Sequence, residues 1–120
     1  MAAKSTRAKL GRVEIQQEKE RLERELNEAV TELAEIGQHL EDRGDYSLGE
    51  GDPAIQTWEL NLALFQRTRD KEESIRAALR RIAEGTYGVC QRCGKRIDRD
   101  RLEIIPDASL CIECARQGKG

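Results

Sequence analysis

Apolar residues recur every three or four positions along the first third of the chain, which predicts a helix. Between residues 13 and 43 there is no proline, and Gly37 is the only glycine. The recurring positions step alternately by four and three residues, the heptad pattern of a helix packed along one partner helix. They are Leu22, Leu26, Ala29, Leu33, Ile36 and Leu40.

A second helix is predicted after the stretch RGDYSLGEGDP, residues 43–53, which contains three glycines and a proline and therefore reads as a turn. Asp52 before Pro53 is typical of an N-cap followed by proline at the first helical position. Arg69 and Glu72 form a polar gap in the apolar pattern of this helix, which predicts a weak middle of the seam. The apolar positions are Ile55, Trp58, Leu62 and Phe65, then Leu79 and Ile82.

The two sets of apolar positions match each other as an antiparallel hairpin. Facing residues in such a hairpin have position numbers with a constant total, and five pairs total 94 or 95, which centres the turn near residue 47. The pairs are Leu40 with Ile55, Ile36 with Trp58, Leu33 with Leu62, Ala29 with Phe65 and Ile15 with Leu79. We therefore expect a coiled-coil hairpin within one chain, with arms of about 45 Å. Pairing of the helices between two chains is the alternative.

All four cysteines lie in the last quarter of the chain, as Cys90-x2-Cys93 and Cys111-x2-Cys114. Two such pairs can hold one zinc ion tetrahedrally, and four thiolates leave no open position, so the site is expected to be structural. Iron also fits such a ligand set. Two disulfides or a redox pair are the alternatives, and the first is disfavoured in a cytosolic protein.

Composition and charge narrow the classes of function. Aromatic residues make up 3% of the chain and charged residues 37%, as in long exposed helices. No apolar run is long enough to span a membrane and no secretory signal is visible, so a cytoplasmic protein is expected. Residues 1–12 carry four bases and no acid, whereas residues 13–52 carry a net charge of −9. Such asymmetry suggests that the two ends meet different surfaces.

We find no catalytic constellation, and the chain is not expected to be an enzyme. His39 is the only histidine, no serine has a plausible histidine partner, and no phosphate-cradling GxxxxGK stretch occurs. The bases between the cysteine pairs could contact phosphates, which makes a zinc-ribbon module that binds nucleic acid an alternative. They are Lys95, Arg96, Arg99 and Arg101. They alternate with acids, so that stretch is close to neutral, which disfavours this alternative. A coiled-coil adaptor is a further alternative.

The stretch from Tyr87 reads Y-G-x-C-x2-C-G-x2-I-x3-R-L-E-x2-P-x4-C-x2-C and resembles the zinc finger of the DksA/TraR (DnaK-suppressor) family of bacterial transcription factors. A long antiparallel coiled coil leading into the finger is also similar to that family. The resemblance implies an all-α fold: a basic tail over residues 1–12, a coiled-coil hairpin over 13–84 with its turn near 44–52, and a four-cysteine zinc finger with a short C-terminal helix or tail over 85–120.

The resemblance also implies a function. Family members bind bacterial RNA polymerase without needing nucleic acid and insert the hairpin into the secondary channel of the enzyme, some together with the alarmone ppGpp. The expected polymerase-contacting tip residues are Asp42, Asp45, Glu50 and Asp52. The best-known members carry D-x2-D-x-A here, where this chain has Asp52, Ile55 and Thr57. We expect a monomer with one structural Zn²⁺.

Overall fold

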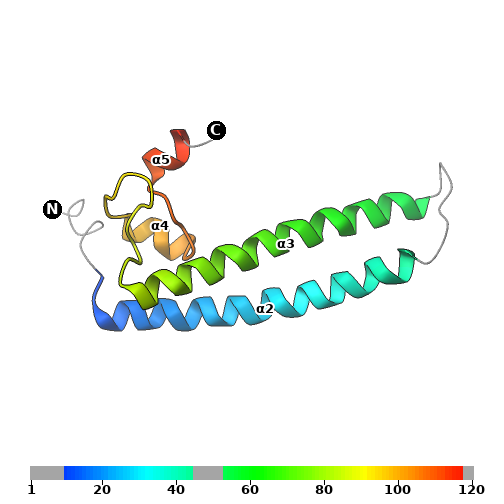
Figure 1. Cartoon of the computed structure of the whole chain (residues 1–120), viewed down its shortest axis with the longest axis horizontal. Helices are drawn as coiled ribbons and strands as arrows, with labels where there is room; N and C mark the ends of the chain where they lie inside the picture. The colour runs from blue at the N-terminus through cyan, green and yellow to red at the C-terminus, as the bar shows by residue number, and fades with distance from the viewer. Residues whose placement is uncertain (1–9, 45–52, 118–120) are drawn as a thin grey trace. The chain divides into compact units, whose positions relative to one another are not determined.

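The computed structural model describes residues 10–44 and 53–117, and the side chains of residues 10–41 and 54–117. These residues form two long helices, α2 (Arg12–Gly44) and α3 (Pro53–Glu84), and two short ones, α4 (Arg99–Ile104) and α5 (Ile112–Gln117) (Figure 1). The only extended pairing among them is an isolated antiparallel bridge between Val89 and Arg96. The fold is all-α, as the sequence predicts. None of the described helices has both the length and the apolar content of a membrane span.

The chain divides into two compact units, each built from both long helices. Residues 25–73 form one, which we call the hairpin unit; residues up to 24 together with those from 74 onward form the other, which we call the finger unit. The first turn of α2 lies in the finger unit, where the carboxylate of Glu14 accepts a 2.8 Å hydrogen bond from the backbone N–H of Gly11. This contact satisfies one of the N–H groups that a helix N-terminus leaves without a partner.

In the hairpin unit α2 and α3 lie side by side (Figure 1). Ala29 and Thr68 are buried, and the Thr68 hydroxyl donates a 3.0 Å hydrogen bond to the carboxylate of Glu32. A Cβ atom on Gly37 would lie 3.6 Å from the ring of Phe65, an ordinary contact distance, so α2 and α3 meet at these two positions. Antiparallel pairing of the two long helices is therefore confirmed.

The register predicted from the sequence is wrong by about two helical turns. The prediction places Phe65 opposite Ala29, whereas Phe65 lies against Gly37, eight residues further along α2. The contact between Thr68 and Glu32 is displaced in the same direction. A heptad pattern looks nearly the same after a shift of seven residues, so the apolar positions alone do not distinguish the two registers.

The polar gap predicted in α3 is also wrong, because the buried face runs through Thr68, Ile75 and Ala78. Arg69 is exposed and Glu72 is only half-buried. The half-buried Leu62 and Phe65 and the buried Thr68 follow one another in two successive steps of three residues. Such an extra three-residue step, a stammer, rotates the buried face relative to a strict heptad.

The predicted weak middle of the seam is instead well packed. Leu22, expected opposite Glu72, is 0% exposed, as are Ile75 and Ala78. These three side chains form part of the core of the finger unit.

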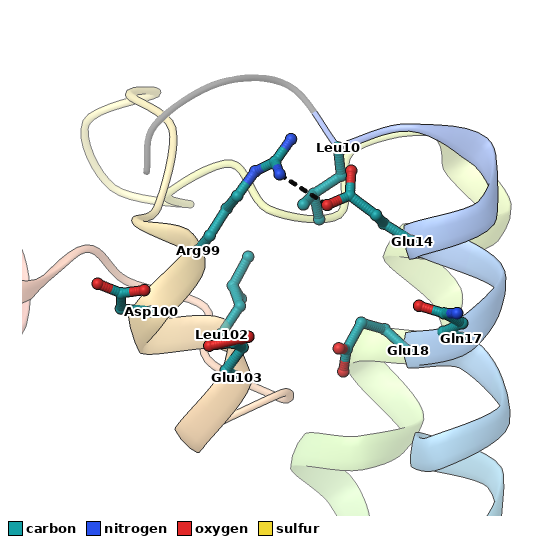
Figure 2. Close-up of a pocket in the computed structure, with 8 residues that line it drawn as sticks. All are labelled: Leu10, Glu14, Gln17, Glu18, Arg99, Asp100, Leu102 and Glu103. Atoms are coloured by element: carbon teal, nitrogen blue, oxygen red, sulfur yellow. Dashed lines mark hydrogen bonds and ion pairs between the residues drawn. The ribbon is translucent and has the colours of Figure 1, made fainter. Parts of the chain in front are cut away.

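Helix α4 docks on the first helix at two points within the finger unit. At its start, Arg99 Nη1 lies 2.7 Å from Glu14 Oε2, and near its end the backbone oxygen of Glu103 accepts a 2.6 Å hydrogen bond from Arg21. Between them Leu102 is buried, at 3% exposure. Figure 2 shows α4 facing α2 across a cavity of about 270 Å³, spanned by the Arg99–Glu14 ion pair. The cavity is lined by Leu10, Glu14, Gln17, Glu18, Arg99, Asp100, Leu102 and Glu103.

Candidate metal centre

The first cysteine pair lies on a tight loop closed by backbone hydrogen bonds. The N–H of Cys90 donates to the oxygen of Lys95 at 2.8 Å, and the N–H of Gly94 donates to the oxygen of Cys90 at 2.9 Å. Gly94 has φ of +80°, a conformation that glycine adopts without strain and other residues rarely adopt. The Val89–Arg96 bridge closes the base of the loop. The sequence therefore places both thiols of this pair on one side of a rigid knuckle.

The second cysteine pair spans the first turn of α5. The N–H of Cys114 donates to the sulfur of Cys111 at 3.4 Å, and the N–H of Ala115 donates to the backbone oxygen of Cys111 at 2.9 Å. The N–H of Gln91 on the first knuckle donates to the oxygen of Ser109 at 2.8 Å. That last bond joins the two loops directly, so the two pairs are held face to face.

All four thiol sulfurs lie within 4.8 Å of one another. Cys93 and Cys111 have sulfurs 3.8 Å apart. Four sulfurs at about 2.3 Å from a central zinc ion sit about 3.8 Å from each other at the corners of a tetrahedron. The observed spacing therefore fits a tetrahedral zinc site. Cys93 is exposed and the other three are buried, so the site is reached from the Cys93 side.

Cys90 and Cys114 differ in their affinity for protons, and a bound divalent cation favours the thiolate form of both. Burial raises the pKa of Cys90, but backbone N–H groups directed at its sulfur, including those of Arg92 and Cys93, outweigh burial and lower the pKa to about 6. Burial, followed by hydrogen bonds with the other thiols, raises the pKa of Cys114 to about 12. A bound cation supplies the positive charge that favours all four thiolates. The donor set fits one structural zinc ion, as the sequence predicts.

Three side chains other than the cysteines hold the second loop in place. The Tyr87 hydroxyl donates to the oxygen of Pro106 at 2.8 Å, Arg81 donates to the oxygen of Ala108 at 3.4 Å, and Arg101 donates to the oxygen of Leu110 at 2.9 Å. Tyr87 is 6% exposed and Arg81 is 9% exposed. These hydrogen bonds fix the backbone carbonyls of residues 106, 108 and 110, which precede Cys111. Their donors are Tyr87, Arg81 of α3 and Arg101 of α4.

Burial changes the protonation of two of these groups. It raises the pKa of Tyr87 far above the usual value of 10, with a further contribution from the negative charge of Glu18. It lowers the pKa of Arg81, and the negative charge of Asp107 partly offsets this. Tyr87 therefore stays neutral and remains a hydrogen-bond donor throughout the physiological range.

The sequence did not assign a role to Arg81. It placed Arg101 only among the bases that could contact phosphates, and Tyr87 only as part of the motif. Tyr87 offered a signal, since it is one of two tyrosines in a chain with 3% aromatics and comes three residues before the first cysteine. Arg81 offered none, because it adjoins the exposed Arg80 in a run of charged residues.

The predicted tip residues lie at or beyond the limits of what the structure describes. Asp42 belongs to the last turn of α2, but its side chain is outside the described set. Asp45, Glu50 and Asp52 lie outside the described residues altogether. Their role therefore stays a prediction. His39 is exposed on α2.

Two facing Cys-x2-Cys pairs with a closed tetrahedral donor set define a C4-type zinc finger. Residues 85–117 match the family described as the prokaryotic dksA/traR C4-type zinc finger. Together with the curated relatives and the solved structure described next, this match shows that the chain belongs to the DksA/TraR family.

The relatives extend the likeness beyond the finger. The RNA polymerase-binding transcription factor DksA of Haemophilus influenzae is 33% identical over 87 residues, which is 71% of this chain and 60% of that protein. DksA of Escherichia coli K12 is 31% identical over 90 residues, 73% of this chain and 60% of that protein. The chain thus aligns with about three fifths of the length of these relatives. The structure of transcription factor DksA2 from Pseudomonas aeruginosa matches with a TM-score of 0.73 and 29% identity, covering 88% of this chain and 83% of that one.

Proposed function

We propose that this protein is a non-enzymatic regulator of transcription that binds bacterial RNA polymerase and inserts its coiled-coil hairpin into the secondary channel. The observation that carries the proposal is the alignment with factors named as RNA polymerase-binding, which covers 71% to 79% of the chain and so includes much of the hairpin as well as the finger. The proposal places the action of the protein in the bacterial cytoplasm, where the polymerase works.

The effector in this proposal is the negative charge about the turn between the long helices. Residues 13–52 carry thirteen acids and four bases, and four of the acids fall on residues 42–52: Asp42, Asp45, Glu50 and Asp52. A carboxylate brought near the catalytic magnesium of the polymerase changes the local field at close range. The alarmone ppGpp is a proposed partner. Its synergy needs its own test, because Ile55 and Thr57 depart from the motif of the best-known members.

The finger has a supporting role in this proposal. Four thiolates close the coordination of zinc and leave no site for a substrate, so the metal supplies folding free energy and no chemistry. The ion pair of Arg99 with Glu14 and the hydrogen bonds of Arg21 to Glu103 and of Arg81 to Ala108 attach the finger to both long helices at their base. A protein that acts through the end of a hairpin needs such a fixed base.

Local cleavage tests where the tip goes. Replacing the active-site Mg²⁺ of core polymerase by Fe²⁺ generates hydroxyl radicals that cut nearby polypeptide backbone. With the zinc-loaded protein labelled at one end, we expect cuts within residues 42–53 and none in residues 85–117. Cuts in the finger alone, or no cuts while the protein is bound, would contradict insertion of the hairpin.

A charge-matched pair of variants tests the effector. Replacing Asp45, Glu50 and Asp52 by their amides should leave polymerase binding in place and remove the effect on transcription in vitro. The control replaces Glu20, Glu23 and Glu59, three exposed acids of the long helices, by glutamine and makes the same change in net charge. If both variants regulate like the unaltered protein, the acidic tip is not the effector.

A further inference from the structure

Basic and acidic residues alternate along the sequence of the finger, but they lie on different parts of its folded surface. Residues 85–117 carry six bases and five acids and look nearly neutral as a string. Two of the bases are used inside the fold: Arg99 pairs with Glu14, and Arg101 donates to the backbone oxygen of Leu110. The three bases of the first knuckle, by contrast, all point to solvent. They are Arg92, Lys95 and Arg96.

The acids of the finger lie mostly on other elements. Asp107 is 8% exposed and lies in the loop beside Arg81. Asp100 and Glu103 line the cavity that faces α2 (Figure 2). The remaining two, Asp98 and Glu113, precede α4 and begin α5. No acid occurs between residues 85 and 97. The knuckle is therefore a basic surface, which the alternating sequence did not reveal.

The knuckle bases have rigid backbones and unused side chains. Residues 91–96 are all exposed, and the loop is fixed by the bonds of Cys90 to Lys95 and of Gly94 to Cys90 together with the Val89–Arg96 bridge. In the described part of the chain, none of the three basic side chains takes part in an ion pair or a side-chain hydrogen bond. Three cations held close together on a fixed loop favour a partner with closely spaced negative charges.

We propose that the first knuckle, through Arg92, Lys95 and Arg96, binds the phosphodiester backbone of nucleic acid. Adjacent phosphates on one strand match basic side chains that are spaced over a short loop. Arginine can bind a phosphate through two parallel N–H groups. The backbone N–H groups of Arg92 and Cys93 are directed at the Cys90 sulfur, so the contacts come from side chains. The exposed part of the knuckle contains no aromatic residue to stack on bases, and binding is accordingly independent of sequence.

The proposal goes beyond polymerase binding and does not depend on it, since it concerns the isolated zinc-loaded protein. Each phosphate contact releases counterions, so the affinity falls as the salt concentration rises. For three contacts, a plot of log affinity against log salt concentration should have a slope of about −2.7 on duplex DNA and about −2.1 on a single strand. The net charge of −2 and the acids of the hairpin weaken binding at a distance, and the slope separates the local contacts from that background.

The test uses fluorescence anisotropy with a labelled random-sequence DNA duplex and a single-stranded RNA, titrated from about 25 to 200 mM salt. We expect weak, saturable binding to at least one, and the ratio of the two affinities at the same salt concentration identifies which source of phosphate is preferred. The triple variant Arg92→Gln, Lys95→Gln, Arg96→Gln should lose that binding while keeping one zinc per chain. The control Arg24→Gln, Arg67→Gln, Arg69→Gln removes three exposed bases from the long helices and should keep the slope.

Two results would overturn the proposal. One is the absence of binding to either nucleic acid at the lowest salt. The other is an equal loss of affinity and slope in the knuckle variant and the control variant, which would assign any binding to net charge and not to this surface.

Discussion

Truncation of Ile75 tests whether the two long helices and the finger share one core. Ile75 is 0% exposed and lies on α3 in the finger unit, together with the fully buried Leu22 and Ala78. Changing it to alanine removes three carbons, about 2.4 kcal/mol of transfer free energy at roughly 0.8 kcal/mol each. The cavity that remains adds to this, and buried isoleucine-to-alanine changes cost about 2–5 kcal/mol in total. We expect the free energy of unfolding to fall by about 3 kcal/mol.

The assay is urea unfolding at saturating zinc, followed by far-UV circular dichroism and by zinc release, which reports on the unit that holds the cysteines. The control is Ile104→Ala, the same chemical change on α4 at a side chain that is 77% exposed. Since about a quarter of that side chain is buried, the control should cost about 0.6 kcal/mol. Equal losses in the two variants would refute the packing described for α3.

Three further predictions concern the finger. Cys111→Ser removes a buried ligand, so zinc content by atomic absorption should fall from one per chain to none and the finger should unfold; retained zinc would contradict the tetrahedral site. A double-mutant cycle on Arg99→Met and Glu14→Gln, measured by urea unfolding, should give a coupling energy of only about 0.2–1 kcal/mol, because the two side chains are 34% and 40% exposed. A coupling energy above about 2 kcal/mol would contradict an exposed ion pair. Tyr87→Phe leaves the Pro106 carbonyl without its donor and should cost about 1–3 kcal/mol at neutral pH. The pKa of Tyr87 is raised in the folded state, so its hydroxyl contributes fully to stability below the unfolded pKa of about 10 and loses that contribution as the pH rises above it. The difference in unfolding free energy between the unaltered protein and Tyr87→Phe should therefore shrink at higher pH. A constant difference would show that the phenol is not buried.

The sequence predicts the elements well, because their signals are local. Alternating steps of four and three residues indicate α2, and Leu22 and Ala29 of that set are buried. Helix α3 begins at Pro53, where a preceding aspartate and the fixed φ of proline favour a helix start. The spacing of the cysteines predicts the tetrad, since each Cys-x2-Cys pair closes on itself before it meets the other.

Register and core composition are harder to predict, because they depend on which residues meet across the hairpin. A shift of seven residues carries a heptad pattern nearly onto itself, and only the particular contacts of Phe65 with Gly37 and of Thr68 with Glu32 distinguish the registers. Ile75 is missed for a related reason, since it falls outside a strict heptad continued from Trp58 and Leu62.

The polar contacts that hold the finger in place are long-range, so the sequence near each residue does not indicate its partner. Arg81 meets Ala108 across 27 positions, and Arg99 meets Glu14 across 85. The same limit explains why the finger reads as neutral along the sequence, although the fold separates the knuckle bases from the acids. The surface charge of such a finger can be predicted only when it is known which charged side chains form contacts within the fold.

Direct titration of zinc-loaded protein into bacterial core RNA polymerase tests the central claim most directly. Fluorescence anisotropy at moderate salt, with a second ligand of the secondary channel as competitor, reports both affinity and location. The proposed function predicts saturable binding at one protein per polymerase that the competitor displaces. Absence of binding by protein that carries its full zinc content, or binding that the competitor leaves unchanged, would contradict it.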